Sequence, residues 1–128
     1  MTVRIVRLGQ PRAANEGTRL GTVRRPPRGV RKADYSKDDW YDVWYPVLAP
    51  SVPTMKLALG ATTARQWSGF VRKFRAEMAA PAASQSLDVL AALSHHANFS
   101  MGCYCEDEAH CHRSVLRALL LARGAKLE

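Results

Sequence analysis

Strand-like segments lie near both ends of the chain, and helix-like segments lie between and after them. Residues 2–8, "TVRIVRL", alternate and are rich in β-branched side chains, as half-buried strands are. Residues 98–105, "NFSMGCYC", form a short apolar run that is typical of a buried strand. Strands separated by helices usually join one sheet that the helices cover, so the sequence predicts the α/β class.

Helical periodicity is clearest over residues 63–79, where apolar side chains recur on one face of a helix. Thr63 and Gln66 have the spacing of a capping box at its start. Further helices are predicted over residues 86–97 and 108–123, and a glycine follows the latter as a C-terminal stop. The apolar face of the first helix consists of Trp67, Phe70, Val71, Phe74 and Met78.

The first half of the chain carries the marks of loops and short strands. Residues 18–24 are predicted to form a weaker second strand, after a loop over residues 9–17 that glycine and proline punctuate. Residues 25–36 contain two adjacent prolines, which donate no backbone hydrogen bonds, so no regular structure is predicted there. The aromatic segment 38–50 is expected to cover a surface or to form a short strand broken by prolines.

Length and composition narrow the class of protein. A chain of 128 residues with 47% apolar and 23% charged residues is typical of one globular domain, here residues 1–128. No apolar run reaches the roughly 20 residues of a membrane helix, and the N-terminus lacks the apolar core of a secretory signal. Three cysteines, an odd number, do not suit a secreted disulfide framework. We therefore expect a cytoplasmic protein without membrane association.

The balance of charge indicates an anionic partner. The chain is basic, with a net charge of +8, and such a surface attracts both polyanions and phosphorylated small molecules. Charge alone does not choose between these two classes. Nothing in the sequence indicates a cofactor or an oligomeric state.

All three cysteines and two of the four histidines fall within residues 102–116, "GCYCEDEAHCHRSVL". Cys103 and Cys105 share one face of the predicted strand, and Cys111 and His112 follow a short loop. Three thiols and an imidazole can fill a tetrahedral zinc shell. The spacing is not that of a zinc knuckle, however, and adjacent residues on a helix point about 100° apart. The sequence therefore favours no metal ligands here, and a metal site stays only as an alternative.

The same stretch can be interpreted as a ligand site, because ligands of open α/β sheets lie at strand carboxyl ends, against helix N-termini. Cationic side chains are disfavoured at a helix N-terminus unless an anion compensates, and the predicted helix has His112 and Arg113 there. Arg113 offers a planar fork to a phosphate or carboxylate, and Ser114 adds a hydroxyl. Cys111 is a candidate nucleophile, and His112 is a candidate acid or base.

A purely structural interpretation of the stretch is equally open. The acidic residues 106–108 can neutralise the neighbouring bases, and Asp107 can cap a helix. His112 falls on the apolar stripe of its helix, so it can be a core histidine that is hydrogen-bonded to a strand carbonyl. The thiols can be small buried hydrophobic groups.

Three segments together resemble the domain-of-unknown-function 488 family (DUF488), in its YeaO-like branch. They are "TVRRPPRGV" (22–30, the arginine loop), "DVWYPVLAPS" (42–51) and "CYCEDEAHCHRSVL" (103–116), which contains a Cys-His-Arg-Ser turn. The arginine loop has one proline more than the plainer family pattern. The resemblance spans nearly the whole chain and implies a compact three-layer α/β sandwich with a mostly parallel sheet flanked by helices. It implies no activity, but it marks the arginine loop and the Cys-His-Arg-Ser turn as hallmark segments.

Together these observations predict a protein that binds or acts on an anionic, phosphate-bearing small molecule. If the two hallmark segments follow neighbouring strands, their arginines face each other across one cleft. The predicted ligand contacts are Arg24, Arg25, Arg28, Arg113 and Ser114, with Cys111 and His112 as catalytic candidates. Two alternatives stay open: nucleic-acid binding through the basic surface, and metal or thiol-redox chemistry at Cys103, Cys105 and Cys111.

Overall fold

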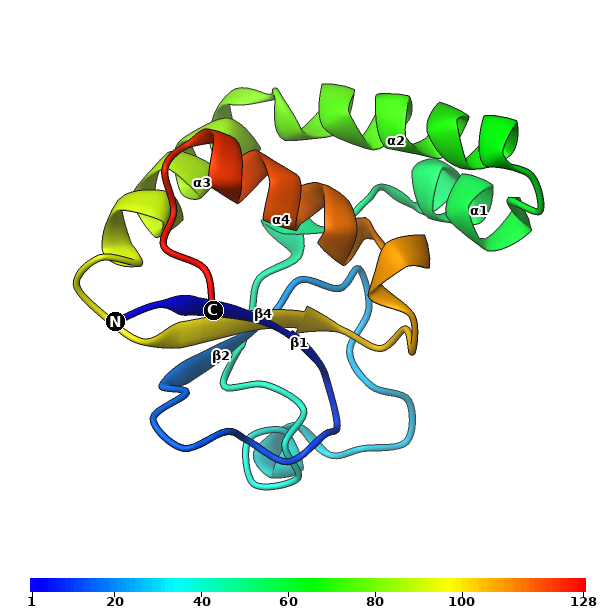
Figure 1. The fold of residues 1–128 in the computed structure, drawn as a ribbon. Helices are drawn as coiled ribbons and strands as arrows, with labels where there is room; N and C mark the ends of the chain where they lie inside the picture. The colour runs from blue at the N-terminus through cyan, green and yellow to red at the C-terminus, as the bar shows by residue number, and fades with distance from the viewer.

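The computed structural model describes all 128 residues, and its centre is a sheet of four parallel strands in the order β1-β4-β2-β3 (Figure 1). The strands are β1 (Val3–Arg7), β2 (Thr18–Gly21), β3 (Val43–Trp44) and β4 (Phe99–Cys103). All five residues of β4 are buried, because this strand lies between β1 and β2. The predicted first and last strands and the parallel sheet are thus confirmed.

Four α-helices cover one face of this sheet (Figure 1). They are α1 (Val52–Gly60), α2 (Ala64–Met78), α3 (Pro81–Leu93) and α4 (His112–Ala122). Short 3-10 helices form at η1 (Lys32–Asp34), η2 (Pro46–Leu48) and η3 (Glu108–His110). The α/β class is confirmed, and the layer on the opposite face is built largely from irregular chain and η1 rather than from α-helices (Figure 1). None of the helices combines the length and the apolar character that crossing a membrane requires.

The core between sheet and helices contains the apolar face predicted for residues 63–79. Phe70 and Phe74 are fully buried and their rings are stacked at a centroid distance of 5.8 Å, while Met78 closes the same stripe. The predicted capping box is also present, since the Thr63 hydroxyl accepts the Gln66 N–H and the Gln66 side chain accepts the Thr63 N–H. The start of α2 and its buried face are therefore both those that the sequence predicts.

The opposite face of the sheet contains a buried ion pair. Arg19 of β2 is 1% exposed, and its Nε donates to Glu16, which is 4% exposed, at 2.7 Å. Its Nη1 donates to the carbonyl oxygens of Gln10 and Asp39 at 2.9 and 2.7 Å. Ser100 of β4 donates to the same carboxylate at 2.7 Å. This network ties the irregular layer to the two central strands.

The buried ion pair predicts a loss of stability in acid. Burial by itself raises the pKa of Glu16, but hydrogen bonds from Arg19, Ser100 and the Ala13 N–H lower it to about 2, against an ordinary 4.5. A folded-state pKa below the unfolded value means that the stabilisation is complete above pH 4.5 and disappears as the pH falls towards 2. The difference corresponds to about 3 kcal/mol. In urea unfolding from pH 6 to pH 2, the free energy of unfolding should fall less steeply for Glu16→Gln than for the unmodified protein. We term this fall with acidification the acid limb.

The control for this pH series is Glu106→Gln, since the Glu106 side chain is 85% exposed and lies 3.7 Å from its nearest cation. Its acid limb should match that of the unmodified protein. Identical slopes for the Glu16→Gln and Glu106→Gln variants would contradict the assignment of the acid limb to the buried pair.

Two helices begin at other residues than predicted, and a further helix was not predicted. Helix α3 begins at Pro81 rather than at residue 86, because proline at the first helical position needs no backbone donor. Helix α4 begins at His112 rather than at residue 108, because Cys111 is extended (φ −133°, ψ 152°) and separates it from η3. Helix α1 was not predicted, since its short apolar sequence has no single hydrophobic face; Ser51 caps it by accepting the Thr54 N–H.

Candidate functional site

The two hallmark segments begin at the same edge of the sheet. Strands β2 and β4 are parallel neighbours, and Gly21 at the end of β2 pairs with Gly102. Parallel strands end on the same side, so the arginine loop and the residues after β4 start next to each other. Helix α4 also begins here, where its His112 Nε2 lies 2.6 Å from the carbonyl oxygen of Thr22. The carboxyl edge of β2 and β4 is therefore the candidate site.

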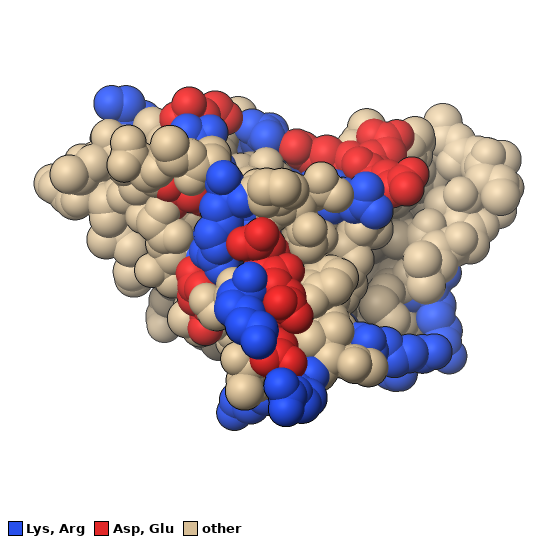
Figure 2. All heavy atoms as spheres, turned by 90° about the horizontal axis from the view of Figure 1, so that it is seen from below, with Lys and Arg blue, Asp and Glu red and all other residues tan.

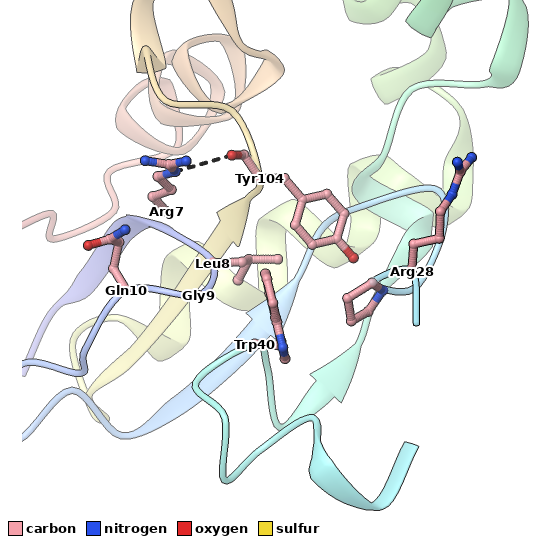
Figure 3. A pocket seen from close by; sticks show the side chains of 8 residues that line it. Arg7, Leu8, Gly9, Gln10, Arg28, Trp40 and Tyr104 are labelled. Atoms are coloured by element: carbon pink, nitrogen blue, oxygen red, sulfur yellow. Dashed lines mark hydrogen bonds between the residues drawn. The ribbon is translucent and has the colours of Figure 1, made fainter. Parts of the chain in front are cut away.

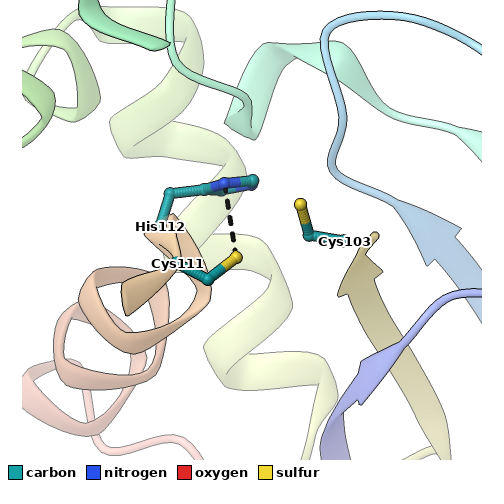
Figure 4. Close-up of side chains that lie close together, drawn as sticks. All are labelled: Cys103, Cys111 and His112. Atoms are coloured by element: carbon teal, nitrogen blue, oxygen red, sulfur yellow. Dashed lines mark hydrogen bonds between the residues drawn. The ribbon is translucent and has the colours of Figure 1, made fainter. Parts of the chain in front are cut away.

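The cysteine and histidine side chains of this edge converge (Figure 4). The Sγ atoms of Cys103 and Cys111 and a ring nitrogen of His112 all lie within 4.8 Å of one another. Cys111 Sγ is 3.8 Å from His112 Nδ1, and Cys105 Sγ is 3.9 Å from Cys103 Sγ. We term these four residues the Cys-His cluster. The expectation that Cys111 and His112 point about 100° apart is wrong, because only His112 is helical.

Arg113 and Ser114 make their contacts inside the protein. The Arg113 side chain is buried, and its Nε donates to Cys111 Sγ at 3.4 Å while its Nη2 donates to the Cys105 carbonyl at 2.6 Å. The Ser114 hydroxyl donates to the Cys111 carbonyl at 2.9 Å. Arg113 thus positions the sulfur of Cys111, and Ser114 stabilises the first turn of α4.

Hydrogen bonds inside the cluster make the thiols unequal. Those from Cys103 and Cys105 lower the pKa of Cys111, and His112 adds to the effect, although burial opposes it. For Cys103, the hydrogen bonds with Cys105 and Cys111 and the burial all raise the pKa above its ordinary value. Cys111 is therefore the thiol of the cluster whose ionised form is favoured, and the Arg113 Nε–H donates to its sulfur.

A pocket of about 270 Å³ lies over the cluster, and we term it the Cys-His pocket. Its wall is mostly apolar, and helix α1 contributes Met55, Ala58 and Leu59 to it. His110 lines it too, with its ring against Trp67 at a centroid distance of 5.6 Å. The α1 residues were missed from the sequence because the helix itself was missed. The other lining residues are Val23, Arg24, Pro50, Phe70, Cys103, Tyr104, Cys105, Cys111 and His112.

Arg24 is the one arginine in the lining of this pocket. Its Nε donates to the Pro50 carbonyl at 3.0 Å, and its Nη2 donates to the carbonyls of Pro46 and Ala49 at 3.2 and 3.0 Å. Arg24 therefore joins the arginine loop to the "LAPS" segment, which is the third part of the resemblance. Its Nη1 makes no hydrogen bond within the chain.

Arg25 and Arg28 lie away from the Cys-His pocket. Arg28 lines a separate pocket of about 370 Å³, where Trp40 and Tyr104 lie between it and Arg7 (Figure 3). The Arg25 side chain is exposed, and the Arg25 carbonyl oxygen accepts a hydrogen bond from the Tyr104 hydroxyl at 2.9 Å. Of the predicted site residues, the structure brings Arg24, Cys111 and His112 into one pocket. It leaves Arg25, Arg28, Arg113 and Ser114 out of that lining.

The basic residues do not form one continuous patch on the face opposite the helices. Figure 2 shows basic and acidic side chains interleaved across the middle of that face. Arg12, for example, is paired with Asp39 and Asp42 at 3.2 and 2.9 Å. Paired charges attract a polyanion less than free ones do, so this face gives little support to nucleic-acid binding.

Comparison with known proteins places the chain in a family. The model of the family described as "Active DUF488-N3 subclade" matches residues 3–124. Neither the curated proteins nor the solved structures contain a match. The matched range includes the arginine loop, the "LAPS" segment and the complete Cys-His cluster, which are the parts of the chain that carried the resemblance. The protein therefore belongs to the DUF488 family.

Proposed function

We propose that the protein binds an anionic small molecule in the Cys-His pocket and presents Cys111 and His112 to it. The main support is that this one pocket is lined by all three segments that mark the family. Arg24 comes from the arginine loop, Pro50 comes from the "LAPS" segment, and Cys111 and His112 come from the Cys-His-Arg-Ser turn. Segments far apart in the sequence thus contribute to a common surface at the carboxyl edge of a parallel sheet, where ligands of such sheets bind.

The size and lining of the pocket suit a small ligand with one charged end. About 270 Å³ is close to the lower limit of ordinary small-molecule sites, and mostly apolar walls with a few polar groups are typical of them. Arg24 Nη1 is available to an anionic group, and His110 adds a second polar contact. The net charge of +8 raises the local concentration of such ligands.

Cys111 and His112 supply the chemically active groups. The thiol and the imidazole are 3.8 Å apart, and the Thr22 carbonyl orients the imidazole from its other side. With the imidazole oriented in this way, Cys111 and His112 can act on a bound ligand as nucleophile and base. Alternatively, both can be ligands of a metal ion. In both cases Arg113 acts by positioning Cys111 rather than by touching the ligand.

Arg24→Met should weaken the binding of anionic probes about 10- to 100-fold, because a charge-assisted hydrogen bond is lost. Inorganic phosphate and a nucleoside monophosphate are suitable probes, with the uncharged nucleoside as reference. Binding is measured by calorimetric titration of the full chain. Arg28→Met is the matched control from the same loop and should bind the probes as the unmodified protein does, since Arg28 lines the other pocket.

Arg24 also holds three backbone carbonyls, so a second variant separates ligand binding from folding. Leu59 is 76% exposed and lies in the pocket lining, so Leu59→Trp should obstruct the pocket and leave the fold intact. Binding that survives both Arg24→Met and Leu59→Trp, or that is lost equally in Arg28→Met, would rule out this pocket. No binding of any anionic probe by the unmodified protein would rule out the proposed ligand class.

A further inference from the structure

We infer that the Cys-His cluster is a binding site for one thiophilic divalent cation of the zinc class. The donor atoms are the sulfurs of Cys103, Cys105 and Cys111 and the Nδ1 nitrogen of His112. This inference goes beyond the proposed ligand of the pocket and does not depend on it. It differs from the expectation drawn from ligand spacing, which rested on a helical Cys111.

The distances between the donor atoms are close to the edges of a coordination tetrahedron. Zinc–sulfur and zinc–nitrogen bonds of about 2.3 and 2.0 Å give edges of about 3.8 Å between two sulfurs and about 3.5 Å between sulfur and nitrogen. The observed distances are 3.9 Å from Cys103 Sγ to Cys105 Sγ and 3.8 Å from Cys111 Sγ to His112 Nδ1. Cys103, Cys111 and His112 offer donors that are all within 4.8 Å of one another. Cys105 lies outside this group of three, and its sulfur reaches the shell from beside Cys103 as the fourth donor.

The imidazole of His112 is held in the tautomer that a metal requires. A backbone carbonyl oxygen can only accept, so the 2.6 Å contact with Thr22 puts the proton on Nε2. The lone pair is then on Nδ1, which lies 3.8 Å from Cys111 Sγ (Figure 4). Histidine ligands of metals commonly donate their second ring N–H to such a carbonyl. The ring is further fixed by Phe74, which packs edge-on at a centroid distance of 5.5 Å.

The charges of the cluster balance once a divalent cation is present. Three thiolates carry a charge of −3, and a divalent cation leaves −1. Arg113 supplies the remaining positive charge, since its Nε–H is directed at Cys111 Sγ at 3.4 Å. Buried charge is tolerated only when it is compensated in this way. Cys111, His112 and Arg113 are each less than one tenth exposed, so this compensation is needed here.

The donor set selects the class of cation. Thiolate sulfur and imidazole nitrogen favour zinc and similar thiophilic ions, whereas magnesium and calcium take oxygen ligands. Regular structure fixes the backbone of two donors, because Cys103 is the last residue of β4 and Cys111 is the N-cap of α4. Cys105 is only half-buried and lines the pocket, so its ligand position is the one most accessible from outside.

The experiment is metal loading of the full chain, reduced and free of any tag. Zinc is added, excess metal is removed, and bound metal is counted by elemental analysis; cobalt replaces zinc for absorption spectroscopy. We expect one zinc ion per chain and, with cobalt, tetrahedral visible bands and thiolate charge-transfer bands. Cys103→Ser and His112→Gln should each lower the zinc affinity at least about 100-fold. His96→Gln is the matched control, because His96 is exposed and outside the cluster.

Cys105→Ser keeps the variant series informative if the more buried substitutions unfold the chain. It should retain cobalt through the other three donors, with a changed charge-transfer spectrum. No retained zinc in the unmodified protein, or equal retention in Cys103→Ser and His112→Gln when far-ultraviolet dichroism shows them folded, would overturn the inference. The inference would also be overturned if the protein formed a Cys103–Cys111 disulfide and bound no zinc after that disulfide was reduced. The two cysteines would then be a redox-active dithiol. Phosphate titration of chelator-treated protein tests the proposed ligand separately.

Discussion

Replacing Arg19 with methionine should lower the free energy of unfolding by about 3–5 kcal/mol, since it leaves a buried carboxylate without its partner. The guanidinium contacts Glu16 through Nε at 2.7 Å and Nη2 at 3.1 Å. It also donates to the carbonyls of Gln10 and Asp39; the Gln10 carbonyl would lose its donor, whereas the Asp39 carbonyl would keep the Gly9 N–H. Urea unfolding at neutral pH measures the change. A loss of this size is a large part of the 5–15 kcal/mol that ordinarily stabilises a domain.

Arg31→Met is the control for the Arg19 variant. Arg31 forms an ion pair with Asp34 at 3.0 Å, but its side chain is 81% exposed. Exposed pairs of this kind contribute about 0–1 kcal/mol, so the control should unfold almost as the unmodified protein does. Similar losses in the two variants would mean that burial is not what makes the Arg19 pair important.

Gly17→Ala should destabilise the fold by more than about 4 kcal/mol or prevent folding. Gly17 has φ +78°, which costs other residues about 1–2 kcal/mol. In addition, a β-carbon there would lie 1.9 Å from the Asn98 carbonyl oxygen and 2.7 Å from its carbon. Both are backbone atoms at the entrance to β4, so relief requires β2 to move away from the central strand. Loss of the cooperative transition in thermal and urea unfolding is the expected observation.

Gly29→Ala separates the two causes of that effect. Gly29 has a similar φ of +73°, but a β-carbon there would meet nothing within 4 Å. It should therefore show only the conformational penalty of about 1–2 kcal/mol. If Gly17→Ala and Gly29→Ala lose equal stability, the close approach of Gly17 to Asn98 is not what requires glycine.

Periodicity predicts those parts of the fold where one face of an element is buried. The stripe of residues 63–79 is such a part, whereas the continuous apolar run at 98–105 predicts a strand that is buried on both faces; both predictions are confirmed. Helix α1 lacks this signal because apolar residues occur all around it, and its role in the pocket depends on packing against α2. The irregular layer depends on contacts between distant residues, such as Arg19 with Asp39, that no local pattern contains.

The site shows a similar division between what is local and what is not. The sequence drew attention to Cys111, His112 and Arg24 by their chemistry, and they do lie at one pocket. The inward direction of Arg113 was not predictable, because it depends on the path of the chain between Cys105 and α4. The convergence of Cys111 with His112 depends on one backbone conformation, the extended φ and ψ of Cys111. A single residue of extended chain thus decides whether the two donors diverge or meet.

The central position of β4 has a consequence for how the chain folds. Val3 of β1 and Thr18 of β2 both pair with Phe99, and β1 and β2 do not pair with each other. A chain that grows from its N-terminus on the ribosome therefore holds β1 without a partner, and β2 with only the two-residue β3 to pair with, until residues 99–103 emerge. Pairings so distant in sequence slow folding and leave strand edges open to aggregation meanwhile. We expect the sheet to assemble in one late step, with nascent chains that depend on chaperones until then.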